Sequence, residues 1–425
     1  MPKNQIISAI DIGTTKITTL IATLSEDREK ISIVGVANEP AKGLRKSQIV
    51  DIDEAIESIT QSVEAAERMA GYSISSCLAS ISGSHIESLN SKGVVAVAEP
   101  EGEISDHDVA RVIEAARAVS LPSSRDILHV IPRDFKVDSQ EGVKDPVGMS
   151  GVRLESETHI ITGSSTAMKN ISKCVSEIGI EIDSLAFSGL VSAEAVLSPT
   201  EKELGVVLID LGGGSTSIAV FVEGALSFSS VLPVGAKNIT NDLAIGLRVS
   251  LETAEKIKIA LSKAKSVTSE TDDDDDELDS KKLNLGEEVG KLSRKTLVEG
   301  IMRPRLNEIF GMVAEELKKS GFGGVTPAGI VVTGGGALTE GLATSCKRTL
   351  SLPVRIGYPK GLTGLIDEIK SPAFATSWGL IEYGHKNFKG VKSDSPFKIM
   401  GKFVNKIPVK GVLDKGVKLI KSFLP

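Results

Sequence analysis

Asp11-Ile12-Gly13-Thr14-Thr15-Lys16 decides the fold together with a second stretch, Asp210-Leu211-Gly212-Gly213-Gly214-Ser215-Thr216. Each stretch follows an apolar run of the buried-strand type and leads into another, over residues 17–24 and 218–222. Glycines let successive backbone N–H groups point into one concavity, which suits an anion. The pattern returns after 199 residues. The sequence therefore predicts two similar α/β halves packed across a cleft, where nucleotides commonly bind.

Two aspartate turns that face each other would hold a polyphosphate from both sides. Asp11 and Asp210 would then hold Mg²⁺, mostly through water, because this ion gives up its hydration shell reluctantly. An aspartate that merely caps a tight turn is the alternative, and the pairing of two motifs favours the magnesium site. A third glycine run, Thr333-Gly334-Gly335-Gly336-Ala337-Leu338, follows apolar residues 329–332 and would cradle a nucleoside.

The bulk composition describes an ordinary soluble protein that is long enough for two or more domains. The chain has 425 residues, of which 41% are hydrophobic and 25% are charged. Its three cysteines lack a CxxC spacing and its five histidines form no pair at metal-ligand spacing, so disulfides and zinc are not expected. The chain opens without a basic-then-apolar leader, and no apolar run approaches about 18 residues. We therefore expect a cytosolic protein without a membrane span.

Periodicity and composition divide the chain into parts. A helical period over 53–69 stops at Gly71, and Ser105 is expected to begin a helix over 106–119 within an inserted subdomain. Further helices are expected at 166–178, 236–246, 250–263 and 290–319. Residues 271–280 hold five consecutive aspartates, for which a solvated loop is the favoured interpretation.

A family resemblance rests on these motifs and on four further strings. The first turn resembles the phosphate-1 motif of the actin, Hsp70 and sugar-kinase superfamily, the second turn its phosphate-2 motif, and residues 334–338 its adenosine motif. Within that superfamily the chain resembles the bacterial cell-division family FtsA over nearly its whole length. The strings that carry this resemblance are Ile81-Ser82-Gly83-Ser84-His85-Ile86, Leu128-His129-Val130-Ile131-Pro132, Gly148-Met149-Ser150-Gly151-Val152-Arg153-Leu154-Glu155 and Ala254-Glu255-Lys256-Ile257-Lys258.

The resemblance implies an actin-like α/β fold of duplicated ribonuclease H-like domains, with two lobes and four subdomains around a nucleotide cleft. It also implies ATP with Mg²⁺, head-to-tail filaments, and a place on the cytoplasmic face of the membrane at the division site. There the family tethers FtsZ through the FtsZ C-terminal tail and recruits later division proteins, which we expect to bind residues 84–162. The expected parts are subdomain IA (1–83), inserted subdomain IC (84–162), IIA (163–235 and 325–385), IIB (236–324), a basic linker (386–410) and a terminal helix (411–425).

Residue by residue, the resemblance assigns ATP contacts to the three motifs and to segments between them. Lys16 has the alternative of a surface lysine, and Glu255 with Lys258 that of a surface ion pair worth about a few tenths of a kcal/mol. The expected ATP residues are Asp11, Gly13, Thr14, Thr15, Lys16, Asp210, Gly212, Gly213, Gly214, Ser215, Thr216, Gly235, Lys237, Glu255, Lys258, Gly334, Gly335, Gly336 and Ala337.

Two further positions are expected from the family pattern. Hydrolysis needs a group that positions the attacking water, and Glu194, on the helix before the second turn, is the candidate. Because no second base of the sugar-kinase type stands out, we expect at most a slow ATPase. For the acidic FtsZ tail, the resemblance points to the helix of Arg303, Arg305 and Asn307, with Arg305 as the expected contact because arginine pairs well with carboxylates.

The C-terminal segment has the pattern of a helix that lies in a membrane interface. Ten lysines against two aspartates from His385 onward give this end a charge of +8, whereas the whole chain carries −7. On a helix over 411–424 one stripe is apolar and lysines flank it. A helix that docks on its own domain is the alternative. The residues involved are Leu413, Val417, Ile420, Phe423 and Leu424 on the apolar stripe, and Lys415, Lys418 and Lys421 beside it.

Two other functions share the expected fold. A sugar or acetate kinase would need a catalytic base in the cleft, and stimulation of ATP turnover by a small substrate would reveal it. A pilus-assembly adaptor similar to PilM would hold a partner's peptide tail and would lack a lipid-binding terminus of its own. The basic amphipathic end of this chain favours the cell-division protein.

Overall fold

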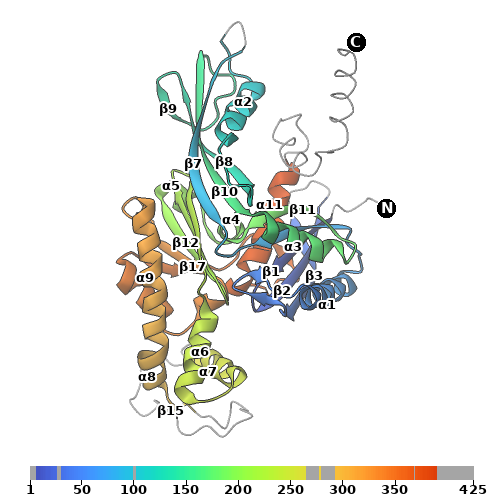
Figure 1. Cartoon of the computed structure of the whole chain (residues 1–425), viewed down its shortest axis with the longest axis vertical. Helices are drawn as coiled ribbons and strands as arrows, with labels where there is room; N and C mark the ends of the chain where they lie inside the picture. Colours follow the sequence, from blue (N-terminus) through green and yellow to red (C-terminus); the bar gives the residue numbers. More distant parts are fainter. Residues whose placement is uncertain are drawn as a thin grey trace, which may run out of the picture.

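The computed structural model describes residues 6–25, 30–98, 102–264, 277–278, 292–367 and 369–389. Two lobes stand side by side, and each is built on a mixed β-sheet with helices packed against it (Figure 1). This is the two-lobed actin-like α/β architecture that the sequence predicts. The expected linker, the terminal helix and the five-aspartate run lie outside the described residues, apart from the start of the linker up to Lys389 and residues 277–278.

The first lobe contains a six-stranded sheet. β1, β2 and β3 form an antiparallel meander, and β6 and β11 then add in parallel beside β1. The sheet order is β11 (Glu181–Phe187), β6 (Ser76–Ile81), β1 (Ile6–Ile12), β2 (Lys16–Leu24), β3 (Ile31–Pro40) and β19 (Thr363–Gly364). The strands are nearly continuous apolar runs because helices cover both faces.

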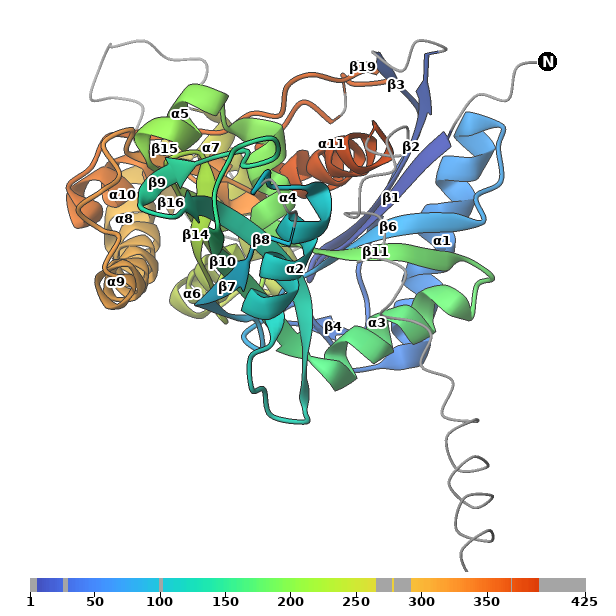
Figure 2. The same ribbon diagram turned by 90° about the horizontal axis from the view of Figure 1, so that it is seen from above.

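Helices α1 (Ile52–Ala70) and α11 (Ala375–Lys389) lie on opposite faces of this sheet (Figure 2). The Asp51 side chain caps α1 by accepting a hydrogen bond from the Glu54 amide, and the helix ends at Gly71 in the left-handed conformation. Both ends are as the sequence predicts. α3 (Ser165–Ser176) packs beside α1, and the small hairpin of β4 (Leu44–Arg45) and β5 (Gln48–Ile49) lies between β3 and α1 in the chain.

The second lobe repeats the order of the first sheet. β12, β13 and β14 form the meander, and β17 and β18 add in parallel beside β12. The sheet order is β14 (Ala225–Leu232), β13 (Thr216–Val222), β12 (Val206–Leu211), β17 (Ile330–Thr333) and β18 (Val354–Ile356). The equivalence of the two meanders confirms the duplicated halves, and it places each aspartate turn at the β1–β2 or β12–β13 connection.

The inserted segment forms a separate sheet at one end of the molecule (Figure 1). α2 (Asp106–Arg117) covers it, and Ser105 with Asp108 forms the capping box that begins the helix. The strand order is β7 (Glu87–Ala96), β10 (Arg153–Ser164), β8 (Arg125–Val137) and β9 (Gln140–Val143). Ser88 and Asn90 of β7 donate hydrogen bonds to the carbonyls of Ser229 and Ser227 on β14, which ties this sheet to the second lobe.

The opposite end of the second lobe is helical. An outer layer packs its apolar residues against one another, and a π-helical turn at Val298–Met302 joins α8 to α9. Its elements are α6 (Ala236–Leu247), α7 (Leu251–Ala264), β15 (Glu277–Leu278), β16 (Leu292–Ser293), α8 (Arg294–Leu297) and α9 (Arg303–Ser320). The remaining helices of the lobe are α5 (Pro199–Leu204) and α10 (Leu342–Leu350), with short 3₁₀ turns at Gly335–Leu338 and Pro372–Phe374.

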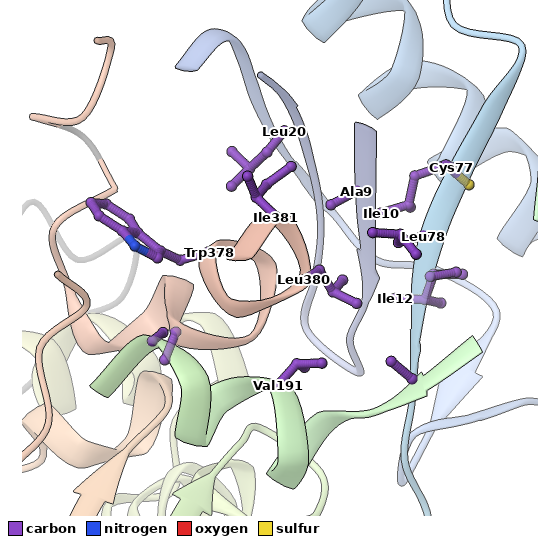
Figure 3. Close-up of a cluster of buried hydrophobic side chains, with 14 of the residues drawn as sticks. Ala9, Ile10, Ile12, Leu20, Cys77, Leu78, Val191, Trp378, Leu380 and Ile381 are labelled. Atoms are coloured by element: carbon purple, nitrogen blue, oxygen red, sulfur yellow. The ribbon is translucent and has the colours of Figure 1, made fainter. Parts of the chain in front are cut away.

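The two lobes meet through α4 (Ser188–Val196) and α11. Val191 of α4 and Leu380 of α11 belong to one continuous hydrophobic core with Ile10 of β1 (Figure 3). A Cβ atom at Gly379 would lie 1.8 Å from the Val191 carbonyl oxygen. Any side chain at position 379 would therefore force the helices apart, and glycine is required for their close approach.

One expected domain boundary differs in the structure. Residues 163–187 were expected in subdomain IIA, but α3 packs on α1, and β11 pairs with β6 of the first sheet. β19 likewise pairs with β3. A parallel strand needs a crossover connection, which here is the inserted subdomain followed by α3; a linear division of the sequence cannot show this return. None of the described helices has the length and apolar character needed to cross a membrane.

Candidate functional site

The two aspartate turns face each other and touch across the lobes. A Cβ atom at Gly213 would lie 2.4 Å from Thr15 Cγ2, and one at Gly214 would lie 2.7 Å from Thr14 Oγ1. Each turn closes with the same backbone hydrogen bond, from Gly13 N to Lys16 O at 3.1 Å and from Gly212 N to Ser215 O at 2.9 Å. The glycines thus permit a contact that larger residues would prevent, and a polyphosphate between the turns requires them to move apart.

Both aspartates end their strands at this contact, and hydroxyl groups from other elements hold them. Ser80 Oγ of β6 donates to Asp11 Oδ1 at 2.7 Å. Ser192 Oγ of α4 donates to Asp210 Oδ2 at 2.6 Å, and Thr376 Oγ1 of α11 donates to the same oxygen at 3.1 Å. Burial raises the pKa of Asp11 to about 6 and raises that of Asp210 as well.

Lys16 is the cation that faces both carboxylates. Burial lowers the pKa of its ammonium group to about 8, although the charges of Asp11 and Asp210 favour the protonated form. The Nζ atom also lies 3.4 Å from the centre of the Phe374 ring. Lys16 is therefore part of the site rather than a surface lysine, and one ammonium is matched with two carboxylates, which leaves an excess negative charge.

We expect the Asp11→Asn protein to be more stable than the wild type without ligand, by about 1–3 kcal/mol above pH 7. Because the folded-state pKa is near 6 and the unfolded value is 3.8, the native state binds the proton more tightly. The destabilisation caused by ionising the buried Asp11 is therefore absent below about pH 4, grows as the pH rises, and is complete above about pH 6. Urea unfolding between pH 4 and pH 8 measures it, and the variant should lose this part of the pH dependence.

Asp108→Asn is the matched control. Burial of the Asp108 carboxylate acts to raise its pKa. Hydrogen bonds from Ser105 and the Ala98 amide, together with the charge of Arg111, outweigh this effect and lower the pKa below its usual value. Its contribution is present at neutral pH and lost on acidification, so this variant should be less stable at pH 7 by about 1–2 kcal/mol. Loss of stability in both variants would show that Asp11 has an ordinary structural role.

The third glycine run lies directly beside the Asp210 turn. A Cβ atom at Gly334, where φ is 86°, would lie 2.3 Å from Asp210 Oδ1, and one at Gly336 would meet Leu211. Gly335 and Ala337 complete the 3₁₀ turn that follows. The structure therefore brings this run to the same edge of the second sheet as Asp210, as expected when β12 and β17 are parallel neighbours.

The start of α6 joins the same place. The amides of Ala236 and Lys237 donate to the carbonyls of Gly212 and Gly213 at 2.9 and 2.8 Å. Gly235 must be glycine because a Cβ atom there would lie 2.6 Å from the Gly212 carbonyl oxygen. Gly235 and Lys237 are thus adjacent to the second turn, as the expected ATP residues require.

Glu255 and Lys258 form a network rather than an isolated surface pair. Lys258 Nζ donates to Glu255 Oε2 at 2.7 Å and to Thr240 Oγ1 at 2.9 Å, and Thr240 Oγ1 donates to Glu255 at 2.5 Å. Lys258 is 8% exposed. Because its Nζ also approaches the Ala236 carbonyl at 3.5 Å, the network fixes α7 against the first turn of α6.

Glu194 lies elsewhere than the position expected of a catalytic group. Its carboxylate pairs with Lys202 Nζ at 2.6 Å and with Lys386, and these charges lower its pKa although burial opposes this. Ser192, two residues earlier and so on another side of α4, is the residue that reaches Asp210. The helix register therefore does not support Glu194 as the water-positioning residue.

Arg305 is already engaged within its own subdomain. Its guanidinium holds Asp242 of α6 through two hydrogen bonds at 2.5 and 2.9 Å and also contacts Glu308, and these carboxylates raise its pKa. Two neighbours on α9 differ. Arg303 Nε and Asn307 Oδ1 are buried atoms without a hydrogen-bond partner in the described part of the chain.

The sequence did not predict the hydroxyl groups that hydrogen-bond to the two aspartates. Ser80, Ser192 and Thr376 come from three distant elements, as does Ser47, whose Oγ lies 2.7 Å from Ser215 Oγ. Serine and threonine are common and form no motif at such separations. The one available signal is Ser192, a polar residue inside the otherwise apolar run Leu190-Val191-Ser192-Ala193.

The donor set fits a magnesium-bound nucleoside polyphosphate. Mg²⁺ is usually bound through one or two carboxylates together with substrate phosphates, so it needs no cage of three protein ligands. Among the described residues, no three or more Asp, Glu, His or Cys side chains are grouped so that they could hold a metal ion by themselves. The site instead offers two facing carboxylates with an excess negative charge, one lysine, and two glycine turns able to direct N–H groups at phosphate.

Two sequence-family models and several bacterial proteins match this chain. A sequence model described as the SHS2 domain inserted in FtsA matches residues 83–162, and one described as cell division protein FtsA matches residues 207–379. The cell division protein FtsA of Pseudomonas aeruginosa is 39% identical over 385 residues, covering 89% of each chain. That of Bacillus subtilis is 37% identical over 413 residues, covering 96% of this chain and 90% of the relative.

Solved structures show the same fold at low identity. The chain is similar to a structure titled PilM-PilN type IV pilus biogenesis complex, with a TM-score of 0.59, 15% identity, and coverage of 89% of this chain and 98% of the other. It is also similar to MreB 5 of Spiroplasma citri bound to AMPPNP, with a TM-score of 0.54, 15% identity, and coverage of 92% and 99%. At this identity the similarity concerns the fold alone.

Proposed function

The chain belongs to the FtsA family of cell-division proteins, and from this premise we propose that it is a nucleotide-controlled scaffold of the division machinery. In this proposal it binds ATP with Mg²⁺ between its lobes and assembles head to tail on the cytoplasmic face of the membrane. It holds FtsZ filaments there and recruits later division proteins through residues 84–162. The observation that carries the proposal is that the two aspartate turns touch across the lobes, where the charge of Lys16 acts on both carboxylates.

The residues of the two turns would divide the work of binding. Asp11 and Asp210 would hold Mg²⁺ largely through water, and the ion would neutralise phosphate charge. Lys16 would contact phosphate oxygens, and the turn residues Thr14, Thr15 and Gly213 to Thr216 would donate hydrogen bonds to them. Gly334 to Ala337 and the Glu255–Lys258 network would border the nucleoside. The ligand offsets the cost of the buried charges that the lobes already carry.

The residues around the site favour binding and closure over rapid hydrolysis. Ser192 and Thr376 hold Asp210 with hydroxyl groups, which position a carboxylate but are poor bases. Glu194 is taken by Lys202 and Lys386. In our proposal the nucleotide therefore mainly fixes the two lobes in one relative position, and turnover is slow.

Equilibrium binding of a fluorescent ATP analogue tests the nucleotide assignment. The full chain should bind it with Mg²⁺ and lose most of its affinity with EDTA. Failure to bind in either buffer, or strong stimulation of turnover by a sugar or acetate, would contradict the proposal in favour of an adaptor or a kinase. A solved relative in fold, MreB 5, is titled as bound to AMPPNP, which supports the choice of ligand.

The FtsZ contact is proposed on α9, at Arg303 and Asn307 instead of Arg305. Arg303 and Asn307 are half-buried residues one turn apart, and each has a polar atom without a hydrogen-bond partner in the described part of the chain. In our proposal a local rearrangement on binding brings these atoms to the peptide, which removes the cost of leaving them unpaired. The free N–H of an arginine that is held by Glu299 on one side also suits an acidic tail. Arg305 instead braces α6 against α9 through Asp242.

Alanine substitutions on α9 separate these roles. Arg303→Ala or Asn307→Ala should weaken binding of an FtsZ C-terminal peptide by about tenfold, because each removes a hydrogen-bonding group from the contact. Arg305→Ala should leave the affinity of the folded protein within about twofold and lower its stability instead, since it leaves Asp242 unpaired. Fluorescence anisotropy of the labelled peptide and thermal unfolding measure the two effects. The reverse pattern would return the contact to Arg305.

A further inference from the structure

We propose that the Ser47 hydroxyl, at the tip of the β4–β5 hairpin, donates a hydrogen bond to the γ-phosphate of bound ATP. The resulting position of the hairpin then affects residues 83–86, where the chain enters the inserted subdomain. This inference rests on the nucleotide binding proposed above and adds a phosphate contact outside the three glycine motifs. Three features carry it: hydroxyl contacts to both turns, a two-residue hairpin tip fixed at its base, and the position of Gln48 beside Gly83.

Ser47 connects the two turns through hydroxyl groups. Its amide donates to Thr14 Oγ1 at 2.8 Å, and its Oγ lies 3.2 Å from Thr14 Oγ1 and 2.7 Å from Ser215 Oγ. Thr14 belongs to the first lobe and Ser215 to the second, and both are less than 9% exposed. Ser47 therefore brings the β4–β5 hairpin to the point where the two turns touch. It lies 33 residues from Thr14 and 168 residues from Ser215 in the sequence.

Ser47 and Thr14 both belong to the first lobe, so only the Ser47–Ser215 hydrogen bond depends on contact between the two turns. A terminal phosphate offers acceptor oxygens and no donor at neutral pH, so each hydroxyl that meets it must rotate its proton towards the phosphate. A nucleoside triphosphate that separates the turns would therefore replace the Ser47–Ser215 hydrogen bond with a bond from Ser47 to phosphate. A diphosphate lacks the γ-phosphate that would accept this bond, so the two nucleotides leave the hairpin in different positions.

The hairpin has a tight two-residue tip and a base held by backbone hydrogen bonds. Lys46 and Ser47 both adopt positive φ angles, 49° and 60°, although neither is glycine. Two positive φ angles in succession are the geometry of a type I′ turn, which two-residue hairpin loops commonly adopt, and non-glycine residues adopt it at some cost. At the base, the Gly43 carbonyl accepts from the amides of Val50 and Asp51 at 2.8 and 3.1 Å, which fixes the hairpin to the start of α1. Movement is thereby concentrated at the tip.

Gln48, the next residue, lies beside Gly83, where the chain enters the inserted subdomain. Gln48 Cγ would lie 3.3 Å from a Cβ atom at Gly83, a residue with φ of 124° that only glycine adopts readily. Gly83 is the first residue of the match to the inserted-domain model, and its carbonyl accepts from the Ile86 amide at 3.0 Å. A shift of the hairpin tip therefore acts on the joint from which the inserted sheet leaves the first lobe.

Nucleotide affinities of position-46 and position-47 variants of the full chain test the phosphate contact. Ser47→Ala and Ser47→Gly should each bind ATP about tenfold more weakly than the wild type, while ADP affinity stays within about twofold. Both remove the hydroxyl, but only the glycine variant also relieves the strained φ. Lys46→Gly, the matched control, relieves strain and keeps the hydroxyl, so both affinities should remain within about twofold.

Hydrogen exchange of the same proteins tests the connection to the hinge. Amides of residues 44–50 and 83–86 should exchange more slowly with ATP than with ADP in the wild type, and Gln48→Ala should remove the difference at 83–86 without changing either affinity. Equal losses of ATP and ADP affinity in the Ser47 variants, or a loss in Ser47→Ala that Ser47→Gly restores, would overturn the phosphate contact. Equal exchange at 83–86 with both nucleotides in the wild type would overturn the link. If the wild type binds neither nucleotide, the proposed function itself fails and this inference with it.

Discussion

Asp210→Asn is expected to abolish magnesium-dependent ATP binding, with a loss of at least about a hundredfold in affinity. The substitution keeps the shape of the side chain and an oxygen that can accept from Ser192 and Thr376. It removes the negative charge, which is what the ion and its water shell require. Titration of fluorescent ATP with Mg²⁺ or EDTA measures the effect, and the variant should show the same weak binding in both buffers.

The control for this result is an aspartate of the inserted subdomain. Asp108 is also buried, but Ser105 and Arg111 hold it far from the phosphate turns. Asp108→Asn should therefore keep magnesium-dependent ATP binding even though it lowers stability. Wild-type affinity in Asp210→Asn, measured on protein that unfolds cooperatively, would remove Asp210 from the metal site.

Deletion of residues 411–425 is expected to abolish co-sedimentation with vesicles that contain anionic lipid and to leave ATP binding intact. The segment lies outside the described residues, so the expectation rests on its sequence: an apolar stripe from Leu413 to Leu424 flanked by lysines. One helix of this length is marginal in water, and Gly416 costs it up to about 1 kcal/mol. Several such helices on one filament would bind together, which raises affinity by about 10² to 10⁴.

Two substitutions distinguish lipid insertion from simple charge attraction. Val417→Asp with Ile420→Asp breaks the apolar stripe and keeps the lysines, and it should lose binding to all vesicles. Neutral vesicles should bind the unaltered chain more weakly than anionic ones, because the lysines contribute about 1 kcal/mol each near an anionic surface. Retention of the deleted protein on anionic vesicles would assign the membrane contact to another part of the chain.

Local sequence signals predicted the elements that have local causes. The spacing of apolar residues and Gly71 predicted α1, and Ser105 predicted the start of α2, because caps and helical periods are properties of neighbouring residues. The duplicated turns predicted two equivalent sheets for the same reason, and the structure has the same strand order in both. The fold class therefore followed from a few short stretches.

Contacts between distant residues were beyond the same reasoning. The hydroxyl groups of Ser47, Ser80 and Thr376 join the site only after three elements have packed together. The family pattern points to Glu194 because it lies on the helix before the second turn, but Ser192 is the residue of that helix that reaches Asp210, and Glu194 on another side pairs with Lys202. Arginine pairs well with carboxylates, which pointed to Arg305 as the contact for an acidic tail. In the structure its guanidinium instead donates to Asp242, 63 residues away. The direction of a side chain and the partners that compete for it depend on the tertiary structure, so short sequence motifs did not predict them.

The position of α11 gives the far end of the described chain a mechanical relation to Asp210. Thr376, in the first turn of the helix, donates to that carboxylate, and Gly379 clamps the helix to α4 one turn later. The helix has 15 residues, about 22 Å of rise. From the Gly379 contact to Lys389 the helix rises about 15 Å, so a tilt of about five degrees around that contact displaces the Lys389 backbone by roughly 1 Å. The helix would therefore turn around the Gly379 contact. A small movement of Thr376 at Asp210 would be accompanied by a larger movement of Lys389, from which the chain continues towards its terminal segment.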